Sequence, residues 1–66
     1  MSLKWLDVLE IAIQLDEKHP DVDPKTVRFV DLHNWVVDLE EFDDDHDHGG
    51  EKVLEAIQMT WIEERD

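Results

Sequence analysis

The residues DLHNWVVDLEE, Asp31–Glu41, carry apolar side chains at intervals of three and four. This spacing places four apolar residues on one side of an α-helix, namely Leu32, Trp35, Val36 and Leu39. Phe42 follows directly and extends that apolar side. The pattern therefore predicts a helix from about Asp31 to Glu41 that packs against the rest of the chain through these residues.

Two further segments show the same spacing, one on each side of this helix. The first predicts a helix from Leu3 to about Lys18, and the last predicts one from about Glu51 to Glu64. Their apolar positions are Trp5, Leu6, Val8, Leu9, Ala12, Ile13 and Leu15 in the first, and Val53, Leu54, Ile57, Trp61 and Ile62 in the last. Pro20 ends the first helix, because proline disfavours helical geometry in the residue before it.

A short additional helix is predicted between the first two long ones. Asp23 is a good N-cap residue and Pro24 suits the first helical position, so this helix runs to about Arg28. Phe29 and Val30 then form a corner.

These elements predict an all-α fold, a small orthogonal bundle of three to four helices. The expected core consists of Leu9, Leu32, Trp35, Val36, Leu39, Leu54, Ile57 and Trp61. We expect a single domain over residues 1–66, in which the segment Asp43–Gly50 is a flexible acidic loop that buries nothing.

The composition limits the possible functions. Six Lys and Arg stand against nineteen Asp and Glu, which gives a formal net charge of −13 and disfavours nucleic acids and membranes as partners. The chain has no cysteine, so it offers no thiolate that accepts sulfur or ligates an iron–sulphur cluster. We recognise no signal peptide and no apolar run of membrane-spanning length, and we expect a cytoplasmic protein.

The negative charge concentrates in Asp38–Glu51, which holds eight carboxylates in fourteen residues and no Lys or Arg. Along the predicted helix and beyond it, five polar residues are spaced by three and four on the side away from the core: Asp31, Asn34, Asp38, Glu41 and Asp45. Two interpretations stay open, a solvated acidic face or a surface that binds a basic partner and cations.

Carboxylate oxygens favour hard cations such as Ca²⁺, Mg²⁺, Mn²⁺ and iron. The order of residues in DDDHDHGG does not match an EF-hand loop, so we expect weak and unselective binding. His46 and His48 add imidazole groups, whose metal contact is either adventitious or physiological. Catalytic carboxylates are disfavoured, because a general acid needs a pKa raised by burial and this segment is expected to face water.

The run DPKTVRFVDLHNWVVDLEEFDDD, Asp23–Asp45, closely resembles the signature of the IscX family, the small acidic proteins of bacterial iron–sulphur cluster assembly. The resemblance reaches back to Leu3-Lys4-Trp5 and forward through EKVLEAI to Trp61, and so covers nearly the whole chain. Val30 departs from the pattern, since a small hydroxyl residue is expected there as a helix cap, and the cap is then weaker or moved to Asp31. The loop His46–Gly50 falls in the variable region, so no family role passes to its histidines.

The resemblance implies a winged-helix-like helical domain that is not an enzyme. It implies binding to an IscS-like cysteine desulfurase, weak binding of ferrous or ferric iron, and modulation of cluster assembly. The implied metal ligands are Asp38, Glu41, Asp43, Asp44 and Asp45. The implied partner-binding residues are Asp38, Glu40, Glu41, Asp43 and Asp44. The predicted partner surface also includes Asp31 and Trp35, which are assigned from their positions on the predicted helix and not from the resemblance.

The favoured function is therefore a non-enzymatic adaptor or regulator of iron–sulphur cluster assembly, acting as a monomer without a tightly bound cofactor. The alternative is a metal-buffering or iron-donor protein. A helical DNA-binding module is less favoured, because six cations among nineteen anions give no electrostatic footprint for phosphates.

Overall fold

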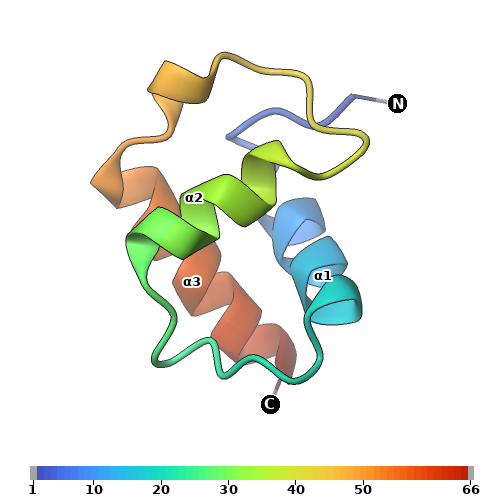
Figure 1. Cartoon of the computed structure of the whole chain (residues 1–66), viewed down its shortest axis with the longest axis vertical. Coiled ribbons are helices and arrows are strands. Elements are labelled where there is room, and N and C mark those ends of the chain that lie inside the picture. The colour runs from blue at the N-terminus through green and yellow to red at the C-terminus, as the bar shows by residue number, and fades with distance from the viewer. Residues whose placement is uncertain (1, 66) are drawn as a thin grey trace.

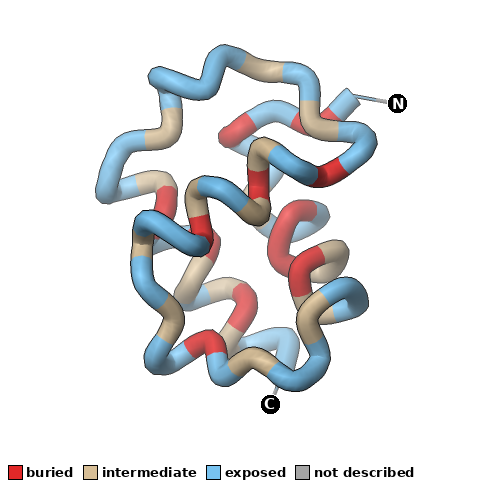
Figure 2. The backbone as a smooth tube through the Cα atoms, viewed as in Figure 1, coloured by how far each residue is buried: buried red, intermediate tan, exposed pale blue. Residues whose placement is uncertain are grey.

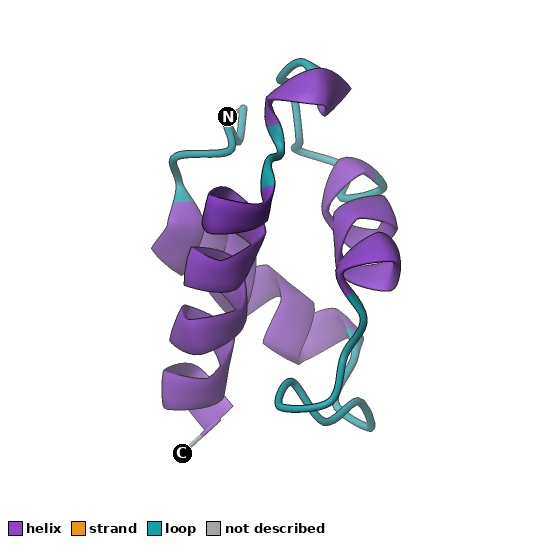
Figure 3. Ribbon diagram, turned by 90° about the vertical axis from the view of Figure 1, so that its left-hand side faces the viewer, coloured by secondary structure: helices purple, strands orange, loops and turns teal. Residues whose placement is uncertain are grey.

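The computed structural model describes residues 2–65, which form three α-helices and one 3₁₀ turn (Figure 1). The helices are α1 (Val8–Lys18), α2 (Phe29–Val37) and α3 (Glu51–Arg65), and the turn η1 spans His46–His48. Helices α1 and α3 make the most extensive contact with each other. Helix α2 lies on one side of this pair, as Figure 3 shows. The predicted all-α class is confirmed.

Extended pairing is limited to one isolated parallel bridge between Leu3 and Phe42 in the described part of the chain. The backbone N–H of Leu3 donates to the Glu41 carbonyl at 2.6 Å, and that of Asp43 donates to the Leu3 carbonyl at 2.8 Å. The prediction that the first helix begins at Leu3 is therefore wrong. Residues 3–5 run beside the segment after α2, because Leu3 and the Trp5 N–H find hydrogen-bond partners in that segment.

Helix α1 begins only after a turn. The Lys4 N–H donates to the Asp7 carboxylate at 2.9 Å, and the Asp7 N–H donates to the Lys4 carbonyl at 2.9 Å. Asp7 has ψ of 55°, outside the helical range, and the first helical bond runs from Ile11 N–H to its carbonyl. The chain thus changes direction between the bridge and α1.

The predicted short helix from Asp23 to Arg28 is also wrong. The Asp23 carboxylate accepts from the Lys25 N–H at 3.0 Å, and the Asp23 carbonyl accepts from the Thr26 N–H at 3.1 Å, which makes a single turn. Arg28 is extended, with φ −81° and ψ 145°, and it caps α2 without a side-chain hydrogen bond.

The boundaries of the second long helix move toward the N-terminus. Phe29 and Val30, predicted as a corner, form the first turn of α2, and Asp31 lies within that turn rather than at its cap. The helix ends at Val37, and not near Glu41, because residues 38–42 turn to reach the bridge.

The core forms where the three helices meet. Six of the eight predicted core residues are buried, namely Leu32, Val36, Leu39, Leu54, Ile57 and Trp61, and they are joined by Leu3, Trp5, Ile11, Ala12 and Leu15. Trp35 is half-buried and stacks on His19 with ring centroids 4.4 Å apart. The assignment of Leu9 to the core is wrong, since this side chain is 56% exposed. Figure 2 shows that the buried residues of α1 face the other helices.

Arg65, the last residue of α3, connects this helix to the C-terminal part of α1 and the residues that follow it. Its guanidinium donates to the Asp16 carboxylate at 2.7 Å and to the carbonyls of Val22 and His19 at 2.6 and 3.2 Å. The bond from Arg65 keeps the pKa of Asp16 below its ordinary value.

No helix in residues 2–65 combines the length and apolar character that a bilayer crossing requires.

Candidate functional site

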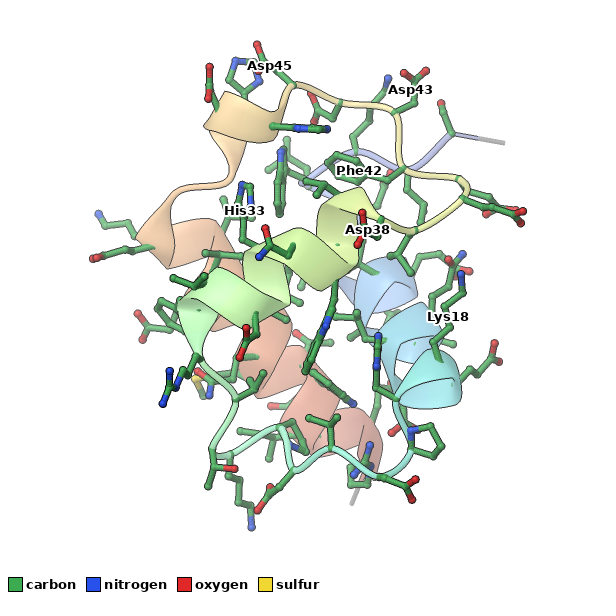
Figure 4. The ribbon with its side chains drawn as sticks, viewed as in Figure 1. Lys18, His33, Asp38, Phe42, Asp43 and Asp45 are labelled. Carbon is green, nitrogen blue, oxygen red and sulfur yellow. The ribbon has the colours of Figure 1, made fainter. Side chains whose placement is uncertain are left out.

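The predicted acidic residues occupy two places (Figure 4). Asp31 lies in the first turn of α2 and is exposed. Asp38, also exposed, is the C-cap residue that follows Val37, the last residue of α2. Glu40 and Glu41 lie in the turn that follows, and Asp43, Asp44 and Asp45 lie in the loop above α2. Because α2 ends at Val37, Glu41 and Asp45 do not continue the line of polar residues along this helix, and that part of the prediction is wrong.

The loop is folded around Trp5, whose side chain is only 2% exposed. The Trp5 indole Nε1 donates to the Asp45 carbonyl at 2.7 Å, and its ring contacts Phe42 edge-on at a centroid distance of 4.9 Å. A Cβ at Gly49 would lie 2.5 Å from the indole Cζ2, so Gly49 packs directly on the ring. The segment 43–50 therefore does bury a side chain, contrary to the prediction that it buries nothing, while its flexibility stays a prediction.

Asp44 is a structural residue of this loop. Its carboxylate accepts from the Trp5 N–H at 3.0 Å and from the Asp45 N–H at 2.7 Å, and its side chain is 22% exposed. These bonds, the one from Trp5 first, lower the pKa of Asp44 below its ordinary value. The expectation that Asp44 faces water like its neighbours is therefore wrong.

The remaining carboxylates differ in how far the chain itself uses them. Asp43 pairs with Lys4 at 3.8 Å, and its carbonyl also accepts from the Lys4 ammonium. Glu41 accepts from the Gln14 amide at 3.1 Å. Three other carboxylates of the predicted site are exposed, those of Asp31, Asp38 and Glu40. None of these three takes part in a hydrogen bond or ion pair within residues 2–65.

Helix α1 adds carboxylates that the sequence analysis did not assign to the site. Glu10 and Glu17 line an open hollow of about 220 Å³ together with Glu40 and Glu41. Ile13, Gln14 and Lys18 complete its lining. The two pairs of glutamates lie far apart in the sequence, and their convergence depends on how the turn after α2 folds against α1. We call the exposed carboxylates of α2, this turn and α1 the acidic face: Glu10, Glu17, Asp31, Asp38, Glu40 and Glu41.

The described residues contain no group of three or more His, Cys, Asp or Glu side chains that converge as metal ligands. Asp43, Asp44 and Asp45 are adjacent, but backbone N–H groups occupy Asp44, and Asp45 accepts from the Asp47 N–H at 3.0 Å. His48 lies 3.6 Å from the Asp44 carboxylate and 3.9 Å from that of Asp45. The five predicted metal ligands are thus not preassembled, and metal binding stays a prediction.

Comparison of the sequence with known proteins identifies its family. The family described as iron–sulphur cluster assembly matches residues 3–66, which is nearly the whole chain. The chain is also 73% identical over 66 residues to the Pseudomonas aeruginosa protein named "Uncharacterized protein PA3808", with all of both chains covered. The match therefore includes the bridge segment, the loop around Trp5 and all three helices, and the chain belongs to the iron–sulphur cluster assembly family.

Proposed function

We propose that this protein is a non-enzymatic adaptor of iron–sulphur cluster assembly that binds a cysteine desulfurase through its acidic face. The observation that carries the proposal is the set of exposed carboxylates that the fold itself leaves unused, at Asp31, Asp38 and Glu40. The absence of any cysteine means that the chain does not take over the sulfur itself. In this proposal it acts in the cytoplasm by binding to the desulfurase. It does so as a monomer, because two copies that each carry a net charge of −13 repel one another.

The IscX-like motif supports the choice of partner, and the exposure of the carboxylates supports the choice of contact residues. Glu41, within the acidic face, and Asp43, outside it, also contribute charge, although Gln14 already contacts Glu41 and Lys4 already pairs with Asp43. Trp35 offers only the exposed part of its ring, because it stacks on His19 and meets Trp61 at a centroid distance of 6.4 Å. The winged-helix-like topology remains part of this proposal.

Salt dependence is the direct test of this function. The dissociation constant for an IscS-like desulfurase should rise several-fold between about 50 and 300 mM salt, because the Debye length falls below about 10 Å above 0.1 M. Isothermal titration calorimetry at the two salt concentrations measures it. Absence of binding at low salt, or an affinity that does not respond to salt, contradicts the proposal.

Iron binding is proposed as weak and secondary. Ferrous iron would bind near Asp38, Glu41, Asp43 and the loop carboxylates Asp44 and Asp45, with rearrangement, since no ligand group is preassembled in residues 2–65. Chemical-shift mapping during an anaerobic ferrous titration is expected to show the largest changes at these carboxylates. Changes confined to His46 and His48 would instead assign the ion to imidazole ligands. The metal-buffering alternative predicts tighter binding to iron than to the desulfurase.

A further inference from the structure

The outer side of α1 carries apolar side chains that the fold leaves in water. Leu6, in the turn before the helix, is 86% exposed, and Leu9 is 56% exposed. Ile13 follows Leu9 by one helical turn and is half-buried. Helix α1 buries three other residues in the core, namely Ile11, Ala12 and Leu15. Its apolar surface is thus wider than the part that the core covers.

This apolar surface borders one part of the acidic face, the four glutamates of the hollow beside α1. Ile13 lines the hollow that contains Glu10, Glu17, Glu40 and Glu41. Glu10 also follows Leu9 directly in the exposed first turn of α1. A molecule that covers Ile13 therefore also meets these carboxylates.

We infer that Leu6, Leu9 and Ile13 form the apolar part of a docking surface whose charged part is the acidic face. The occupant is a protein surface that presents an apolar side chain flanked by Lys or Arg. This inference rests on the proposed function, because it assigns the surface to the same desulfurase partner.

Charge selects this occupant among those that cover apolar surfaces. Four carboxylates and only one cation, Lys18, line the hollow beside Ile13, so a basic protein surface is attracted there. A second copy of this chain would bring its own charge of −13 and the same carboxylates against them. An anionic lipid surface is repelled for the same reason.

The two parts of the surface contribute differently to binding. The carboxylates speed association and make it sensitive to salt, whereas burial of apolar side chains slows dissociation and responds little to salt. Loss of the apolar part should therefore weaken the complex without changing its salt dependence. Loss of the charged part should reduce the salt dependence itself.

The test is the double variant Leu6→Gln/Leu9→Gln, which keeps the net charge and replaces exposed side chains. Its affinity for the desulfurase is expected to fall about tenfold or more, with an unchanged salt dependence. Its thermal unfolding midpoint should not fall, because neither side chain belongs to the core. Met59→Gln is the matched control, since Met59 is 55% exposed on α3, and it should bind like the wild type.

Each other outcome overturns the inference in a recognisable way. Wild-type affinity in the double variant, together with salt-sensitive binding, removes the apolar part and leaves the proposed function standing. Failure of the wild-type chain to bind the desulfurase removes both. If sedimentation shows a wild-type dimer that the double variant dissociates, the occupant is a second copy. If the wild-type chain binds phosphatidylglycerol vesicles and the variant does not, the occupant is a lipid surface.

Discussion

Replacing Asp31, Asp38 and Glu40 together with Lys is expected to weaken desulfurase binding about a hundredfold or more, because like charges placed against a basic surface cost several kcal/mol. The helical circular-dichroism signal should remain. These three side chains are exposed and take no part in the hydrogen bonds and ion pairs of residues 2–65. Calorimetric titration of the folded variant against the desulfurase measures the loss.

The choice of residues follows from the loop structure. Asp44 is left out because its carboxylate accepts from two backbone N–H groups, so a Lys there would disturb the loop as well as the charge. A matched control replaces the exposed Glu51, Glu55 and Glu63 of α3 with Lys, which changes the net charge equally. Equal losses in both variants would mean that total charge, and not the acidic face, governs binding. Wild-type affinity in the first variant would place the contact elsewhere.

The helices were predictable because they follow from local spacing of apolar residues. The predicted last helix ends within one residue of α3, whose apolar pattern is local. The first helix was predicted too long because Trp5 and Leu6 lie three residues before Val8 and Leu9, which is helical spacing. The bridge to Phe42 and the bonds of Trp5 to the loop compete with helix formation there, and both partners lie far along the chain.

The burial of individual side chains could be predicted only where the core covers the whole apolar side of a helix. In α3 the predicted residues Leu54, Ile57 and Trp61 are all buried, since α1 and α2 both pack on them. In α1 the apolar arc is broader than the contact, and Leu9 falls outside it. Spacing alone cannot tell which part of a broad arc faces the partner helix.

The sequence shows that acidic residues are concentrated at the site. It does not show which carboxylates stabilise the loop and which face water. Asp44 and Asp38 look alike in the sequence, yet one carboxylate holds the loop and the other faces water. That distinction depends on where Trp5 lies. The contribution of Glu10 depends equally on a tertiary contact, the packing of the turn after α2 beside α1.

Trp5→Ala is expected to lower the free energy of unfolding by about 3–5 kcal/mol, as truncation of a buried Trp does. A domain of this length holds roughly 3–10 kcal/mol in total, so the variant should be close to unfolded. It loses the indole bond to Asp45 and the contacts with Phe42 and Gly49 together. Thermal and urea unfolding followed by circular dichroism measure this. Trp5→Phe, which keeps an aromatic ring, should lose considerably less.

The contact between Trp5 and Gly49 makes the test specific to the loop. A Cβ at Gly49 would lie 2.5 to 2.8 Å from three indole carbons, whereas one at Gly50 meets nothing within 4 Å. Neither glycine has a positive φ, so the two positions differ in space and not in backbone strain. Gly49→Ala should therefore cost about 1–3 kcal/mol by overpacking, and Gly50→Ala only the small cost of Ala before a helix.

A double-mutant cycle joins these two changes. In the Trp5→Phe background the outer indole atoms that Gly49→Ala would strike are gone, so the second substitution should cost less than it does in the wild type. The interaction free energy from the four unfolding measurements reports the ring-to-loop contact directly. Strictly additive losses would mean that Trp5 and Gly49 do not touch. The loop that carries Asp44 and Asp45 would then be held by its own turn bonds, and the conformation of the acidic segment would not depend on the residues before α1.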